Sequence, residues 1–167
     1  IVKNAAELTH TEDGFAYIYD AAINELVVKA AIGRKAEDYK GFRIKPGEGM
    51  GGKVWQSGQP LLIEDYRNWP GRSSASLFDD IVAALGVPII SGERVLGVIG
   101  LVFYDTDTQF HPEEVDIVCR FADLAAIALE NANLYSQMQT ELAEKQRVES
   151  ALRLSEQHYR SVFENTG

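Results

Sequence analysis

Hydrophobic and polar positions alternate along the first two thirds of the chain in short runs that predict strands. Six such runs, bounded by turn residues, lie at positions 14–20, 25–32, 42–44, 61–64, 82–90 and 94–104. The last run is almost wholly apolar, which predicts a central strand covered on both faces. Gly97 and Gly100 inside it predict close packing or a bend, and Pro88 predicts an edge or a bulge.

The last third of the chain has the pattern of one long helix. Pro112, Glu113 and Glu114 are typical of a first helical turn, and neither proline nor glycine follows until about residue 163. The first half carries two apolar stripes and is therefore expected to pack against two partners. These stripes are Val115, Cys119, Ala122, Ala126 and Leu129, and Ile117, Phe121, Leu124 and Ala128. At the other end, Ile1, Ala5 and Leu8 have helical spacing without a preceding cap, which suggests an excised fragment.

A heptad phase continues along the second half of this long helix. One line runs through Ile127, Leu134, Glu141, Val148, Ser155 and Val162, and the other through Asn131, Met138, Lys145, Leu152 and Tyr159. Because apolar and polar residues mix at these positions, the pattern predicts a weak, switchable coiled coil. A single solvated helix is the alternative.

A glycine-rich turn at residues 45–66 allows two interpretations. Gly47, Gly49 and Gly52 match the G-x-G-x-x-G pattern of dinucleotide-binding folds. Gly58 and Pro60, however, stop the following helix after about two turns, too early for a βαβ unit. A tight turn with positive φ that leads into a short packing helix is therefore favoured.

Charge and composition narrow the choice of partners. The net charge of −9 disfavours nucleic acid and anionic membranes. Residues 33–72 are an exception, with eight Lys and Arg against five Asp and Glu. With one cysteine and no apolar run of spanning length, the sequence predicts a cytoplasmic segment that does not insert into a membrane.

Several segments follow one another in a characteristic order: the strand hairpin, the glycine turn with its short helix, GQPLLIED at 58–65, VPI at 87–89, LGVIGL at 96–101 and AAIALENANLY at 125–135. In this order they resemble the GAF domain over residues 1–136. Residues 137–156 resemble a signalling helix. Residues 157–167 resemble the truncated start of a PAS domain, on the sequence SEQHYRSVFEN at 155–165.

The resemblance implies an α+β fold with a six-stranded antiparallel sheet, helices on one face, a pocket on the other and a long C-terminal helix. The pocket residues that it implies are Phe42, Ile44, Met50, Trp55, Asp65, Tyr66, Trp69 and Phe78, with core packing the stronger interpretation for Trp55. The positive charge excess adds Arg43, Arg67 and Arg72 as contacts for an anionic ligand. A homodimer is expected through Phe121, Leu124, Ile127, Leu134, Met138, Val148 and Leu152.

The residues argue against the known chemistries of this fold. Free methionine sulfoxide reduction needs an acidified thiol with a resolving partner, whereas Cys119 stands alone on an apolar stripe and is expected to be a buried structural thiol. A covalent bilin would need a pocket-side cysteine, and haem a pocket-side histidine, for which only His10 is arguable. His10, His111 and His158 lack metal-ligand spacing, and the Asn-Lys pair of cyclic-nucleotide-binding members is absent.

The resemblance implies a regulatory small-ligand sensor of a multi-domain signal-transduction protein, such as a sensor histidine kinase of a two-component system. It would not be an enzyme, and it would signal through a dimeric helix to PAS-like and output domains. A non-covalent ligand is possible and no cofactor is certain. The alternative is a ligand-free module that only dimerises and transmits, with a pocket filled by its own side chains. A reductase is disfavoured.

Overall fold

In the computed structural model, which describes residues 1–164, the chain divides into two compact units. The first unit spans Ile1–Ile127 and the second begins at Ala128. The first contains the sheet and its flanking helices, and the second continues the C-terminal helix.

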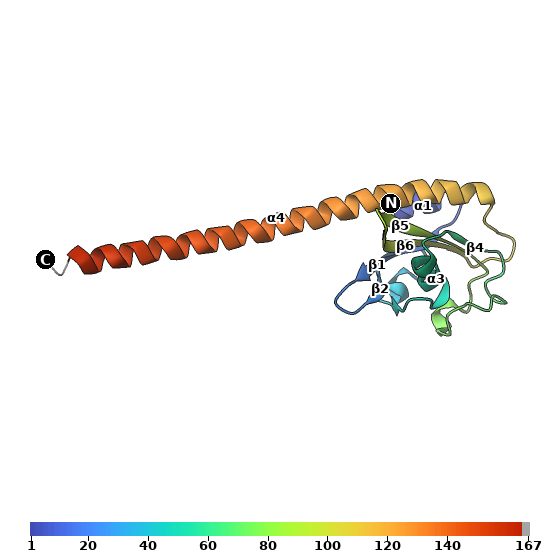
Figure 1. Cartoon of the computed structure of the whole chain (residues 1–167). Helices are drawn as coiled ribbons and strands as arrows, with labels where there is room; N and C mark the ends of the chain where they lie inside the picture. Colours follow the sequence, from blue (N-terminus) through green and yellow to red (C-terminus); the bar gives the residue numbers. More distant parts are fainter. Residues whose placement is uncertain (165–167) are drawn as a thin grey trace. The chain divides into compact units, whose positions relative to one another are not determined.

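A six-stranded antiparallel sheet forms the centre of the first unit, as the sequence predicts (Figure 1). Its strands have the spatial order β3-β2-β1-β6-β5-β4. They are β1 (Asp13–Asp20), β2 (Glu25–Ile32), β3 (Arg43–Ile44), β4 (Leu61–Ile63), β5 (Ala83–Ser91) and β6 (Arg94–Phe103). Since every neighbouring pair is antiparallel, the βαβ unit of a dinucleotide fold is excluded.

Strand β6 lies between β1 and β5, which confirms its predicted central position. Its two glycines permit close packing. A Cβ at Gly97 would lie 2.2 Å from the Tyr17 carbonyl oxygen, and one at Gly100 would lie 2.2 Å from the Phe15 ring. The apolar run was therefore read correctly, and its glycines mark contact with β1.

Pro88 lies in β5, which pairs with β6 on one side and with β4 on the other, and a proline is uncommon in such an inner strand. Strand β4 pairs with β5 only from Ala84 to Gly86, so the side of β5 beyond that point has no neighbouring strand. The register also shifts between Ile89 and Ile90. The predicted edge and the predicted bulge are thus both present.

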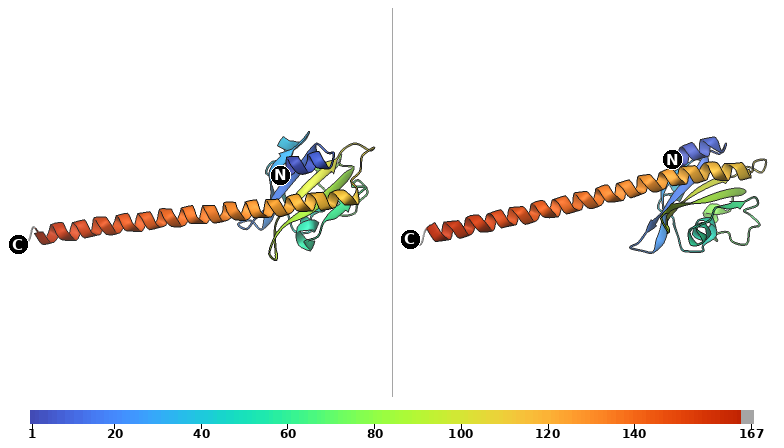
Figure 2. Two further views of the ribbon diagram at one scale, coloured as in Figure 1. Left: turned by 90° about the horizontal axis from the view of Figure 1, so that it is seen from above. Right: turned by 45° about the horizontal axis from the view of Figure 1, so that its top comes forward.

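Helices cover the two faces of the sheet differently (Figure 2). Helix α1 (Val2–Leu8) and the first turns of α4 (Pro112–Glu164) lie on one face, and α4 buries Val118, Ala122, Ala125 and Ala126. On the opposite face lie the short helices α2 (Ala36–Tyr39) and α3 (Gly49–Ser57) and the 3-10 helix η1 (Ser76–Phe78). These short elements leave room for loops. The face of the sheet that they cover holds the core aromatic cluster.

The glycine-rich segment forms the tight turn that the sequence favours. Gly47 and Gly49 have φ values of 78° and 57°, and Gly58 ends α3 in the left-handed conformation. A Cβ at Gly52 would lie 2.4 Å from the Lys45 carbonyl oxygen, so the turn also needs the missing side chain there. The motif therefore shapes a bend between β3 and a nine-residue helix.

The second unit is the continuation of α4, a single helix of 53 residues that runs to Glu164. The apolar residues on its heptad lines, from Ile127 to Val162, are 51–67% exposed. The domain limits 1–136, 137–156 and 157–167 stay predictions. So does the PAS resemblance, of which residues 165–167 lie outside the described residues. No helix within residues 1–164 is both long enough and apolar enough to cross a bilayer.

Candidate ligand cavity

A small cavity lies between the sheet, α3 and the long β4–β5 connection. The strands supply large side chains on one side, while α3 supplies its glycine-rich first turn and the connection closes the other side. Its walls are formed by Phe15, Tyr17, Ile44, Glu48, Gly49, Met50, Gly51, Tyr66, Ser73, Phe78, Ile81, Ala84 and Val102. The walls are mainly apolar and aromatic, with a few polar groups, which is the usual composition of a small-ligand site.

The cavity is narrow in this conformation. Its volume is about 10 Å³, near the minimum that holds one water molecule. Phe78 packs at 5.6 Å from the Tyr39 ring and at 5.1 Å from the Phe42 ring, measured between ring centroids. A larger ligand must therefore displace wall side chains, of which Met50 is the most adaptable because its thioether chain has three rotatable bonds.

The polar groups of the walls are mostly hydrogen-bond donors. Tyr17 is 2% exposed, and its hydroxyl makes no hydrogen bond within the described residues. The N–H groups of Gly49, Met50 and Gly51 belong to the first turn of α3. They also have no hydrogen-bond acceptor within the described residues, because Glu48 provides no side-chain cap. Tyr66 accepts the Ser73 N–H through its hydroxyl at 3.5 Å, which leaves the phenolic proton free to donate.

Burial keeps these phenols neutral. The pKa of Tyr17 is raised well above its ordinary value by burial, with further contributions from Tyr66 and from the Glu48 carboxylate. Burial also raises the pKa of Tyr66. Both hydroxyls therefore remain donors across the physiological range.

The side chains that the sequence proposed for the pocket are not all in the walls. Ile44, Met50, Tyr66 and Phe78 line the cavity. The other aromatic ones pack around the core cluster, partly buried: Phe42 against Phe78, Trp55 against Tyr19 at 5.0 Å, and Trp69 against Tyr66 at 5.8 Å. Asp65 is exposed and accepts hydrogen bonds from Asn68, which lower its pKa.

The strands supply wall residues that the sequence reasoning missed. Phe15 and Tyr17 come from β1, and Ala84 and Val102 come from β5 and β6. Because side chains alternate between the faces of a sheet, Phe15, Tyr17 and Tyr19 had to share one face. That alternation was visible in the sequence, but which face carries the cavity was not.

The cations of residues 33–72 do not line the cavity. Arg43 and Arg67 are exposed, and Arg72 lies 3.6 Å from Asp79. A buried carboxylate ligand would lose hydration worth several kcal/mol. The N-terminus of α3 would stabilise the carboxylate by only about 0.3–2 kcal/mol. Glu48, whose side chain is also acidic, is one of the wall residues. Anion contacts by these three arginines stay a prediction, and they would have to form at the surface, outside the cavity.

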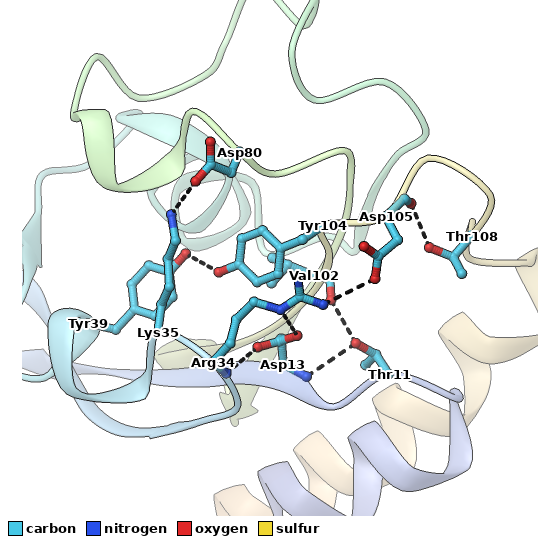
Figure 3. Close-up of polar contacts among 10 residues, drawn as sticks. All are labelled: Thr11, Asp13, Arg34, Lys35, Tyr39, Asp80, Val102, Tyr104, Asp105 and Thr108. Carbon is cyan, nitrogen blue, oxygen red and sulfur yellow. Dashed lines mark hydrogen bonds and ion pairs between the residues drawn. The ribbon is translucent and has the colours of Figure 1, made fainter.

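A cluster of polar contacts lies beside η1, outside the cavity walls (Figure 3). Lys35 donates from Nζ to Asp80 Oδ2 at 2.7 Å and lies 5.4 Å from the centre of the Tyr104 ring. Beside it, the hydroxyls of Tyr39 and Tyr104 are 2.6 Å apart in a buried hydrogen bond. The contact of Lys35 with Asp80 ties the start of α2 to the segment just after η1, and the contact of Tyr39 with Tyr104 ties the end of α2 to the residue that follows β6.

Arg34 completes this cluster on the other side of Tyr104 (Figure 3). Its guanidinium lies 4.9 Å from the centre of that ring and donates from Nη2 to Asp105 Oδ2 at 3.1 Å. Asp13 accepts the Arg34 backbone N–H at 2.6 Å and also lies 3.5 Å from the guanidinium Nε. Burial raises the pKa of Tyr104 to about 12, although the hydrogen bond to Tyr39 and the charge of Arg34 oppose this.

Other candidate chemistry finds little support in the described residues. Cys119 is half-buried on α4 rather than fully buried, and burial and two nearby aspartates raise its pKa, so the thiol is not activated. His10 and His111 lie in a separate surface groove beside the β6–α4 connection. Within residues 1–164, no group of three or more His, Cys, Asp or Glu is arranged to hold a metal ion.

Comparisons with known proteins identify the family to which this chain belongs. Residues 1–130 match the sequence model of the GAF domain, so the chain belongs to the GAF domain family. The Nif-specific regulatory protein of Herbaspirillum seropedicae is 32% identical over 80 residues, which are 45% of this chain and 15% of that protein. The chain spans only a small part of the curated relative that it matches.

Solved structures share the fold. The GAF domain from a phosphoenolpyruvate-protein phosphotransferase of Coxiella burnetii has a TM-score of 0.73 at 24% identity, with 81% of each chain covered. The free methionine-R-sulfoxide reductase of Neisseria meningitidis, solved in complex with its substrate, has a TM-score of 0.64 at 21% identity, with 80% of each chain covered. The same fold therefore serves an enzyme as well as other proteins, and only the residues of this chain can distinguish between these roles.

Proposed function

We propose that this domain senses a small, non-covalent ligand in the cavity and transmits its binding through α4. The observation that carries this proposal is the Tyr17 hydroxyl, which belongs to a cavity wall and makes no hydrogen bond to the described residues. Among those residues no fully buried side-chain nitrogen or oxygen lacks a partner, so this hydroxyl faces the open space of the cavity. A wall that served only as core would favour phenylalanine there, whereas a ligand that accepts from Tyr17 recovers the hydrogen bond.

The second candidate function is that of a ligand-free module that only dimerises and transmits. It is favoured by the size of the cavity, because a space of about 10 Å³ is nearly filled by the domain's own side chains. The two functions differ in whether a small molecule raises the melting temperature, because a ligand that binds only the native state stabilises that state by mass action.

We expect that some compounds in a broad library of small molecules raise the melting temperature of this domain. At a concentration 100 times the dissociation constant, a ligand stabilises the fold by about 2.7 kcal/mol, which corresponds to a shift of several degrees. Differential scanning fluorimetry measures it, and a filling substitution such as Ala84→Leu, on the cavity wall, should reduce the shift. A library without any stabilising compound would leave the ligand-free module as the function.

The proposal extends to the whole protein through the long helix. The resemblances to a signalling helix and to the start of a PAS domain support a multi-domain sensor, such as a histidine kinase of a two-component system. The regulatory relative supports a role in signalling without specifying the output domain. An enzymatic role for the domain itself is disfavoured, because Cys119 is a single thiol with a raised pKa.

Transmission through a weak coiled coil makes the phase of the helix decisive. Polar residues at heptad positions, among them Asn131, Glu141 and Lys145, weaken such a coil and let it hold two arrangements that a ligand can bias. Removing seven residues between Gln139 and Ser150 preserves the heptad phase, whereas removing four rotates everything downstream.

We therefore expect the seven-residue deletion to retain most of the regulation in the full-length protein and the four-residue deletion to abolish it. The measurement is the output activity of both deletions with and without the signal, at matched protein levels. Equal regulation in the two deletions would mean that the linker is a passive tether, and the transmission model would then be abandoned.

A further inference from the structure

The cavity offers a ligand more hydrogen-bond donors than acceptors. Its free donors are the Tyr17 hydroxyl, the phenolic proton of Tyr66 and three backbone N–H groups at the start of α3. A ligand that satisfies them must accept hydrogen bonds. Its remaining surface must be apolar, since the opposite walls consist of Phe15, Ile81, Val102 and similar side chains.

The charges of the walls decide between a neutral and an anionic acceptor. No lysine or arginine lines the cavity, and the one ionisable acid in its walls is Glu48. The Glu48 carboxylate accepts the Lys45 N–H at 3.2 Å, which keeps it beside the first turn of α3. An anion would therefore enter an apolar space next to a like charge, without a cation to balance it. A neutral carbonyl avoids both penalties and still accepts from the same donors.

We propose that the cavity recognises a small, uncharged, planar apolar molecule through a carbonyl-type oxygen that accepts from the Tyr17 hydroxyl and the first-turn N–H groups of α3. This rests on the proposed sensory function and specifies its ligand class. Two independent features coincide at one place: a helix of nine residues with an uncapped first turn, and a phenol that is 2% exposed and has no partner within residues 1–164. The ligand enters by displacing Met50 and Phe78.

Three molecules of nearly equal shape test the ligand class. Acetophenone carries a neutral carbonyl, benzoate carries a carboxylate in its place, and α-methylstyrene carries no acceptor. Titration is followed by the melting temperature and by the amide signals of Gly49, Met50 and Gly51 in ¹⁵N-resolved NMR spectra. We expect acetophenone to bind with millimolar affinity and to move these amide protons downfield, α-methylstyrene to bind more weakly without that shift, and benzoate not to bind at the same concentrations.

Tyr17→Phe tests the anchoring residue. It should weaken acetophenone about tenfold, the loss of one hydrogen bond, while leaving α-methylstyrene unchanged. The unliganded melting temperature should stay the same or rise, because the hydroxyl that is removed has no partner. Tyr135→Phe, at an exposed position of α4, is the matched control and should alter neither affinity.

The outcomes separate this inference from the function on which it rests. Benzoate binding more tightly than acetophenone, or equal acetophenone affinity in Tyr17→Phe, would overturn the inference. The same holds if library compounds stabilise the domain and acetophenone does not. If neither the three probes nor any library compound binds, the sensory function fails as well.

Discussion

Replacing Leu134 and Met138 together by aspartate is expected to convert a dimer of this chain into a monomer. Both side chains lie on the predicted heptad lines and are 57% and 67% exposed in the single chain. Burying each against a second copy contributes about 1.5–3 kcal/mol, and the dimer contains four such side chains. Their loss should weaken association by at least about a thousandfold, since each factor of ten corresponds to about 1.4 kcal/mol.

The measurement is sedimentation equilibrium or light scattering over a range of protein concentrations. Ser136→Asp with Thr140→Asp is the matched control, because it adds the same charges to the same helix at positions off both heptad lines. That pair should leave association nearly unchanged. Circular dichroism should show an intact sheet in both variants. A wild-type chain that stays monomeric at high micromolar concentration would rule out the dimer.

The second large effect is expected in alkali, where the domain should unfold cooperatively above about pH 10. Four tyrosines are buried, and burial raises the pKa of each of them: Tyr17, Tyr39, Tyr66 and Tyr104. Each is neutral in both states at lower pH, so its stability contribution is intact there. Above the unfolded pKa of about 10, the unfolded chain releases protons that the folded chain retains, and stability falls as pH rises toward the folded pKa, which is about 12 for Tyr104.

Each such group lowers the free energy of unfolding by about 1.4 kcal/mol per pH unit, so four together give about 5 kcal/mol per unit. A domain with a typical stability of about 5–15 kcal/mol should then unfold within a few pH units. Urea denaturation at pH 9.5 to 11.5 measures the slope, and phenolate absorbance should change together with the loss of structure.

Tyr17→Phe removes one of the four groups without removing a hydrogen bond, so it should reduce this slope by about a quarter. Tyr135→Phe, at an exposed position, should leave it unchanged. Gradual ionisation of all tyrosines near pH 10 with the fold retained would contradict the expectation.

The sequence by itself determined most of the elements, and its resemblance to the GAF family implied the fold class. Alternation and apolar runs identified all six strands, because the period of a strand is fixed by its backbone and one face must be buried. Gly58 and Pro60 placed the end of α3, and Pro112 placed the start of α4. These signals are local, so no distant contact was needed to interpret them.

Only the tertiary structure decided which residues form the cavity. The wall combines β1, β5 and β6 with α3 and the β4–β5 connection, and these segments meet only after the sheet has formed. The loops suggested Trp69 and Arg67, which lie outside the cavity walls, while β1 supplied Tyr17, whose hydroxyl makes no hydrogen bond to any residue from 1 to 164. Periodicity indicates that a side chain is buried, but whether its polar atom finds a partner depends on contacts far apart in sequence.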